Sequence, residues 1–221
     1  MSVSTEKITC VYATPYIRHA KYGIISHAEL FTIAENAKKN TDIIDWLLKT
    51  SLKQIHEWYI AGFKPEALSI QVSLAQMENT NFVFRIAQTL HEYNTHFIEI
   101  IFEITEDKVP RKITLNTKSF SALRDQGVKF AIGLYTFGQF ALHKAMNFPI
   151  NYLHIDANLL FKHDNITQTI VATLQHTDIK LIVVGIETEE QKALLQAMGY
   201  DLMQGKIFDK HLPHLLPAEN F

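Results

Sequence analysis

The chain has 221 residues, with 21 basic against 23 acidic side chains and one cysteine, Cys10. The near-neutral balance excludes a polycationic surface for nucleic acid, and one cysteine excludes an internal disulfide and a multi-cysteine zinc site. No stretch approaches about eighteen uninterrupted apolar residues, and Met1–Pro15 has no basic segment followed by an apolar run. We therefore expect a cytoplasmic protein of one domain, residues 1–221, with no nucleic-acid or membrane partner.

Short apolar, β-branched runs alternate with amphipathic stretches along nearly the whole chain. Because the runs are near-continuous, they are typical of strands buried on both faces of a parallel sheet. They lie at Ile8–Tyr12, Leu68–Val72, Phe97–Ile104, Val128–Leu134, Tyr152–Ile155 and Lys180–Val184, with a weaker one near Asp201–Met203. The helical candidates are Ala28–Lys39, Ile43–Ile60, Phe82–Tyr93, Lys118–Gln126, Phe137–Met146, Thr167–His176 and Glu189–Met198. This alternation indicates repeated βα units and favours a (β/α) barrel over an open doubly wound sheet.

Functional side chains of such a barrel lie where its strands end, at the carboxyl rim. A hydrolytic metal site would need several oxygen ligands converging there. The strand ends in this chain read Gln71-Val-Ser73, Glu103-Ile-Thr-Glu106, Gly133-Leu-Tyr135, His154-Ile-Asp156, Val184-Gly-Ile-Glu187 and Gln204-Gly205.

Motifs at these strand ends resemble those of one family. They are Phe102-Glu-Ile-Thr-Glu106, Leu153-His-Ile-Asp156, Gly185-Ile-Glu-Thr-Glu-Glu-Gln191 and Met198-Gly-Tyr-Asp-Leu-Met-Gln-Gly205, with an earlier stretch at Gly23–Glu35. In this order and spacing they resemble the EAL-domain cyclic di-GMP phosphodiesterases, from about residue 7 to residue 213. The resemblance implies an α/β fold with a TIM-like (β/α) barrel of the EAL type. In the active family, two magnesium or manganese ions activate a water that opens cyclic di-GMP.

Most positions that carry this chemistry in the family are replaced here. The E-A-L glutamate falls at Thr14, the N-L-S asparagine at Gln71, the paired aspartates of D-D-F-G at Gly133 and Leu134, the water-activating lysine at His154, and the first glutamate of E-G-V-E at Val184. Two dications need the carboxylates that hold them. We therefore expect a degenerate, inactive domain with no catalytic residue, no bound metal and no other cofactor.

Four family positions remain as candidate ligand-binding remnants: Glu103, Asp156, Glu187 and Gln204. The resemblance implies that Glu103 is a direct metal ligand, that Asp156 lies near the metals, that Glu187 and Glu106 steady loops, and that Gln204 borders the pocket. Alternatively, Glu103 accepts hydrogen bonds from the backbone or from His154, as buried carboxylates must. Glu106 and Glu187 are equally consistent with a helix cap and a solvated loop charge.

The barrel is also expected to lack its first strand, because the strand that opens the family's barrel has no counterpart before Ile8–Tyr12. An uncovered strand edge presents unpaired backbone groups and is available for pairing. Residues Met1–Lys7 folding over the gap, or closure with fewer strands, are the alternatives.

Three functions stay open. The one we favour is a regulatory domain of bacterial signalling that acts through a protein partner or a homodimer. The second is a receptor that binds cyclic di-GMP without cutting it, although the family's arginine-bearing segment is shortened around Arg18. The third is a residual phosphodiesterase. Aromatic residues at the rim, Tyr135, Phe137 and Phe140, suit interface anchors, or fill the vacated metal pocket.

Overall fold

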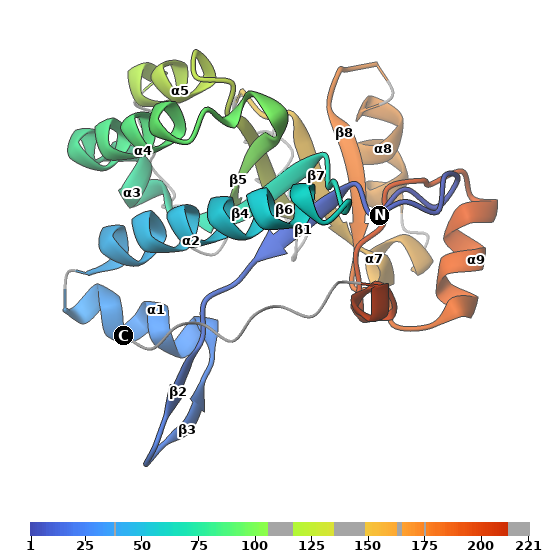
Figure 1. Cartoon of the computed structure of the whole chain (residues 1–221). Helices are drawn as coiled ribbons and strands as arrows, with labels where there is room; N and C mark the ends of the chain where they lie inside the picture. Colours follow the sequence, from blue (N-terminus) through green and yellow to red (C-terminus); the bar gives the residue numbers. More distant parts are fainter. Residues whose placement is uncertain (38, 106–116, 135–148, 163–164, 175, 212–221) are drawn as a thin grey trace.

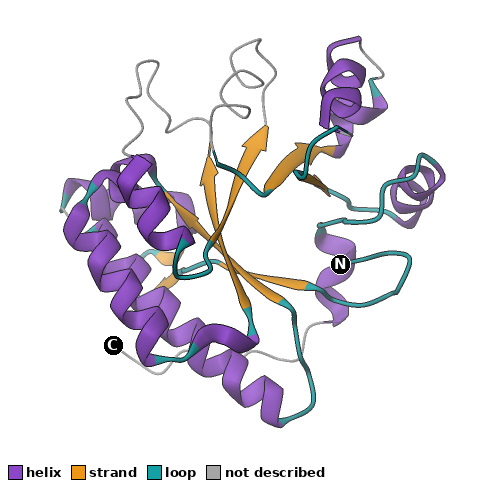
Figure 2. Cartoon of the chain, turned by 90° about the horizontal axis from the view of Figure 1, so that it is seen from above, coloured by secondary structure: helices purple, strands orange, loops and turns teal. Residues whose placement is uncertain are grey.

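The computed structural model describes residues 1–37, 39–105, 117–134, 149–162, 165–174 and 176–211. A six-stranded sheet of order β1-β4-β5-β6-β7-β8, parallel throughout, forms its centre. Its strands are β1 (Cys10–Ala13), β4 (Ala67–Val72), β5 (Glu99–Thr105), β6 (Lys129–Leu134), β7 (Tyr152–Asp156) and β8 (Lys180–Val184). The sheet curls into a half-barrel with helices outside it (Figures 1 and 2). The predicted α/β, TIM-like architecture is confirmed.

The helices follow the predicted order with ends shifted by a few residues. They are α1 (His27–Asn36), α2 (Asn40–Ile60), α3 (Leu74–Glu78), α4 (Thr80–Glu92), α5 (Thr117–Arg124), α7 (Ala157–Phe161), α8 (Asn165–Leu174) and α9 (Glu189–Ala197), with 3-10 helices η1 (Thr95–Phe97) and η3 (Lys206–His211). The expected helix Phe137–Met146 lies outside the described residues. The prediction missed α3, α7 and a hairpin of β2 (Ile17–His19) and β3 (Gly23–Ile25), which projects away from the sheet (Figure 1).

Local side-chain caps explain where several helices begin. Thr188 and Gln191 form a capping box at the start of α9, and Ser73 with Gln76 forms another at α3. Each box satisfies backbone N–H groups that have no partner within the helix. Before α1, Glu29 Oε2 accepts from the backbone N of Ser26 at 2.9 Å.

The main hydrophobic core lies between the outer face of β4, β5 and β6 and the helices α2, α4 and α5. We call this the covered side of the molecule. Its fully buried members include Leu48, Ile86, Phe102, Leu123 and Phe130. Burying a large apolar side chain stabilises a fold by about 1.5–3 kcal/mol, so this layer supplies much of the driving force for folding.

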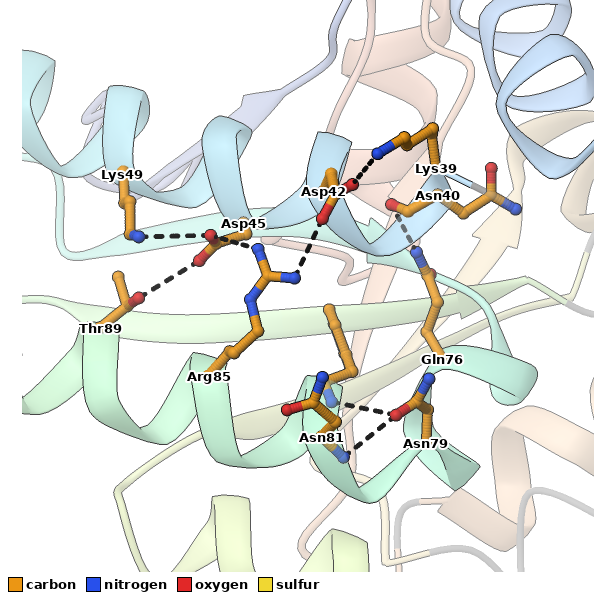
Figure 3. A network of polar contacts seen from close by, with 11 residues as sticks. Lys39, Asn40, Asp42, Asp45, Lys49, Gln76, Asn79, Asn81, Arg85 and Thr89 are labelled. Carbon is orange, nitrogen blue, oxygen red and sulfur yellow. Dashed lines mark hydrogen bonds and ion pairs between the residues drawn. The ribbon is translucent and has the colours of Figure 1, made fainter. Parts of the chain in front are cut away.

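A polar network fastens α4 to α2 on the covered side (Figure 3). Asp45 accepts from Arg85 Nη2 at 2.7 Å, from Lys49 Nζ at 3.2 Å and from Thr89 Oγ1 at 3.3 Å. Asp42 accepts from Arg85 Nη1 at 3.0 Å. Burial alone would raise the pKa of Asp45, but hydrogen bonds from Arg85 and Lys49 outweigh it and hold that pKa below its usual range.

No strand of the described sheet precedes β1, as predicted. Residues 1–7 form a turn, in which Ser2 makes isolated antiparallel bridges to Lys7 and Leu202. Ser2 Oγ also donates to Asp201 Oδ2 at 2.9 Å. Since Met203 forms a parallel bridge with Val183 of β8, this turn links the start of β1 to the β8 end of the sheet. The expected weak strand near Asp201–Met203 is therefore present only as isolated bridges.

Candidate functional site

The pleat of the strands decides which side chains face the inside of the half-barrel. Alternate residues point to opposite faces of a strand, and those facing the helices form the apolar core. The inward set therefore includes Gln71, Glu103 and His154, which alternate with core residues of their strands. The register sets Gln71 beside Glu103, Gly133 beside His154, and Asp156 beside Val184.

Glu103 and His154 form a buried pair at the centre of the rim. His154 Nδ1 lies 3.1 Å from Glu103 Oε1, and the two side chains are only 4% and 2% exposed. Tyr12 lies close enough for the Glu103 charge to act on it: burial raises the pKa of the Tyr12 hydroxyl, and this charge raises it further. The two groups are in contact without an aligned hydrogen bond, because His154 Nδ1 has no hydrogen-bond partner within the described structure.

Gln71 contacts a residue that sequence reasoning did not select. His27, the first residue of α1, places its Nε2 against Gln71 Oε1, and its ring packs against Phe31 with centroids 4.6 Å apart. The stretch Gly23–Glu35 resembles the family pattern G-x-I-x-P-x-x-F-I-x-x-A-E, in which a proline stands at the position of His27. A polar residue in place of that proline was the available signal.

Asp156 serves as the cap of α7. Its Oδ1 accepts from the backbone N of Asn158 at 2.8 Å. Gly185 has a φ of +81°, and a Cβ there would lie 3.4 Å from Asp156 Oδ2. The left-handed backbone explains why glycine suits this position.

Gln204 and Gly205 fasten the last described segment to β8. The backbone N of Gln204 donates to Val183 O at 2.8 Å, and Ile186 N donates to Gln204 O at 3.2 Å. A Cβ on Gly205 would come within 1.9 Å of Ile186 O, so a larger residue could not fit without moving the backbone.

The remaining selected residues do not converge on one point. Thr14 is exposed, while Val184 is buried. Glu187 is a loop charge paired with Lys206 at 3.1 Å, both side chains being largely exposed. Leu134 ends β6, and its side chain, like Glu106, Tyr135, Phe137 and Phe140, is outside what the structure describes.

Oxygen atoms at the rim are the groups that a divalent cation would need. Within the described ranges, no three His, Cys, Asp or Glu residues are grouped so as to hold a metal ion. Oxygen atoms of Glu103, Asp156 and Gln71 are already engaged by His154, the α7 backbone and His27. Gly133 offers no ligand.

The curled parallel sheet with polar residues at its carboxyl rim defines a protein of the (β/α)-barrel class. The family model described as the EAL domain matches residues 1–211, and the chain belongs to this family. A similar curated relative is the signaling protein YkoW of Bacillus subtilis, 27% identical over 218 residues, covering 96% of this chain and 27% of YkoW. The cyclic di-GMP phosphodiesterase NbdA of Pseudomonas aeruginosa is 23% identical over 210 residues, covering 92% of this chain and 27% of NbdA.

Among solved structures, the Pseudomonas aeruginosa FimX EAL domain bound to c-di-GMP superposes with a TM-score of 0.77 at 16% identity. The match covers 93% of this chain and 84% of that one. At this identity the likeness shows the fold alone. The chain spans about a quarter of the length of the curated relatives above. No helix in the described part of the chain has the length and apolar character needed to cross a bilayer.

Proposed function

We propose that this chain is a single, catalytically inactive EAL domain that acts in bacterial cyclic di-GMP signalling through contact with another protein. The observation that carries the proposal is the Glu103–His154 pair. The carboxylate that would be a metal ligand in the active family is buried against a histidine, at a position where the family has a lysine. The interaction partner supplies the regulatory output, and no cofactor takes part.

Residue identities at the rim support the loss of hydrolysis. Gly133, Leu134, Val184 and Thr14 stand where the active family carries acidic residues. A two-metal mechanism relies on carboxylates to hold both ions against their mutual repulsion. With the remaining oxygens engaged in protein contacts, hydrolysis has no metal centre to use.

A second candidate function is a cyclic di-GMP receptor. The FimX domain of similar fold is bound to c-di-GMP, which makes the same ligand reasonable here. Arg18 lies on the exposed hairpin strand β2, and Gln71 and His27 supply polar groups near the rim. Phosphate contacts of this kind do not require a metal.

One set of measurements tests both candidates. The purified chain is incubated with cyclic di-GMP in magnesium or manganese, and linear pGpG is measured by chromatography against a Glu103→Ala control. We expect no product above this control, and product above it would refute inactivity. Isothermal titration with cyclic di-GMP, with and without magnesium, then decides the receptor function: metal-independent binding supports it, and no heat at millimolar ligand rejects it.

A further inference from the structure

A cavity of about 530 Å³ runs along the free edge of β1 inside the half-barrel. Five consecutive residues of this edge, Ile8–Tyr12, border it. Leu202–Gly205 and Phe208 border the opposite side, and Ser69, Ile101 and Ile182 form part of the inner wall. We call this space the β1 slot. The β1 slot is therefore extended along the β1 strand.

The backbone of β1 is arranged to pair on both sides. Thr9 O accepts from Ala67 N at 2.9 Å, so Thr9, Val11 and Ala13 direct their backbone groups to β4. Parallel pairing then leaves the N–H and C=O of Cys10 and Tyr12 pointing the other way, into the β1 slot. The described sheet has no strand there. Unpaired edges of this kind accept an added strand.

Side chains in the slot add a chemical preference. Ser69 is 4% exposed, and its hydroxyl has no hydrogen-bond partner within the described structure. Glu66 and Glu99 border the end of the slot where β1 begins, together with Tyr152 and Lys180. Tyr152 donates to Glu99 Oε1 at 2.5 Å. Two carboxylates outnumber Lys180 at this end, and the other cation that borders the slot, the amino group of Met1, donates to Met203 O at 2.8 Å.

The size of the slot also fits a peptide. With about 3.3 Å of rise per residue, 4.8 Å between strands and 10 Å between packed layers, one extended residue occupies roughly 160 Å³. The 530 Å³ of the slot therefore takes roughly three to four residues. This is close to the 4 residues of β1.

We propose that the β1 slot binds an extended, basic peptide segment of a partner protein, which adds a strand to the edge of β1. A small polar or apolar side chain faces Ser69, and a basic side chain lies against Glu66 and Glu99. The inference deepens the proposed function, on which it rests for its biological meaning, by naming the kind of partner. A strand is favoured over a small molecule because both slot-facing residues, Cys10 and Tyr12, present one donor and one acceptor each.

The test uses the ¹⁵N-labelled 221-residue chain and the peptide Ac-KVSVK-NH2, whose lysines make binding independent of strand direction. In the free chain we expect the amides of Cys10 and Tyr12 to exchange with solvent about tenfold faster than that of Val11. Saturating peptide should slow both to the rate of Val11. Ac-EVSVE-NH2 should bind about tenfold more weakly, and a backbone N-methylated KVSVK should not bind.

Matched variants separate edge pairing from general adhesion. Tyr12→Pro removes one slot-facing N–H without breaking a bond to β4 and should weaken peptide binding about tenfold, whereas Tyr12→Phe should bind like the wild type. If Tyr12→Pro does not fold, the N-methylated peptide provides the same test. Equal binding of the acidic and basic peptides, no amide response at millimolar peptide, or amides of Cys10 and Tyr12 already as protected as Val11 would each overturn the proposal. None of these readouts depends on hydrolysis, so the proposed inactivity stands or falls separately.

Discussion

The covered side and the opposite, open side of the half-barrel differ in how they are stabilised. On the covered side, β4–β6 pack against α2, α4 and α5 with fully buried aliphatic and aromatic residues and a linked ion network. The open side consists of the β1 edge, β8 and residues 201–208, joined through isolated bridges around the β1 slot and through a smaller buried cluster that includes Val183, Met203 and Phe208. The covered side therefore holds the larger apolar core, and the open side combines a smaller core with a cavity.

The largest effect should come from the core of the covered side. Leu48→Ala removes a fully buried side chain and should lower the free energy of unfolding by about 3 kcal/mol. Ile182→Ala, at the slot wall, should cost less than about 1 kcal/mol because that side chain already borders a cavity. Urea denaturation measures both. Equal losses would show that the two sides do not differ as described.

A smaller loss is expected at the rim. Glu103→Ala leaves the buried His154 without this carboxylate and should lower the free energy of unfolding by about 2 kcal/mol. Glu103→Gln retains an acceptor and should cost less. The stability of Glu103→Ala relative to the wild type is informative. If Glu103 belonged to a cluster of carboxylates that lacked its metal ions, removing it would relieve repulsion between the carboxylates and stabilise the protein. A more stable Glu103→Ala variant in denaturant titrations would therefore argue for a metal-ligand role.

Breaking the ion network should have a pH-dependent effect of about 1–2 kcal/mol. Asp45→Asn weakens contacts with Arg85 and Lys49, which hold the pKa of Asp45 below its unfolded value of about 3.9. Because the folded pKa is lowered, the stabilisation is complete above the unfolded pKa and is lost as pH falls through the folded one. Unfolding at pH 7 and near pH 2 should show the difference between wild type and variant disappearing. A difference that persists at low pH would contradict this assignment.

The smallest effect should be at the exposed Glu187–Lys206 pair. Lys206→Ala should change the free energy of unfolding by no more than about 0.5 kcal/mol, because exposed ion pairs gain little over solvent contacts. Thermal unfolding at low and high salt provides the measurement. A loss above about 1 kcal/mol would mean that the loop after β8 stabilises the open side more than its contacts suggest.

Strand order and the covered side were predictable from sequence because buried parallel strands read as continuous apolar runs. The rim was predictable as a set of positions, since strand ends converge by topology. Contacts were not. Sequence reasoning missed the His27–Gln71 pair, which depends on where α1 begins, and the β2–β3 hairpin, whose six strand residues are largely exposed and carry no core pattern. The role of Asp156 as a cap is likewise set by the local backbone at α7.

The contact between Ser2 and Asp201 has a consequence for the order in which the molecule assembles. It joins residues 199 positions apart, so the two ends of the open side meet only after nearly all of the chain exists. At roughly 5–20 residues per second of synthesis, that is about ten to forty seconds. The covered side relies on closer neighbours in sequence and can form earlier. During translation, the amino-terminal turn therefore waits for residue 201 to emerge, and the open side is the last part of the described molecule to assemble.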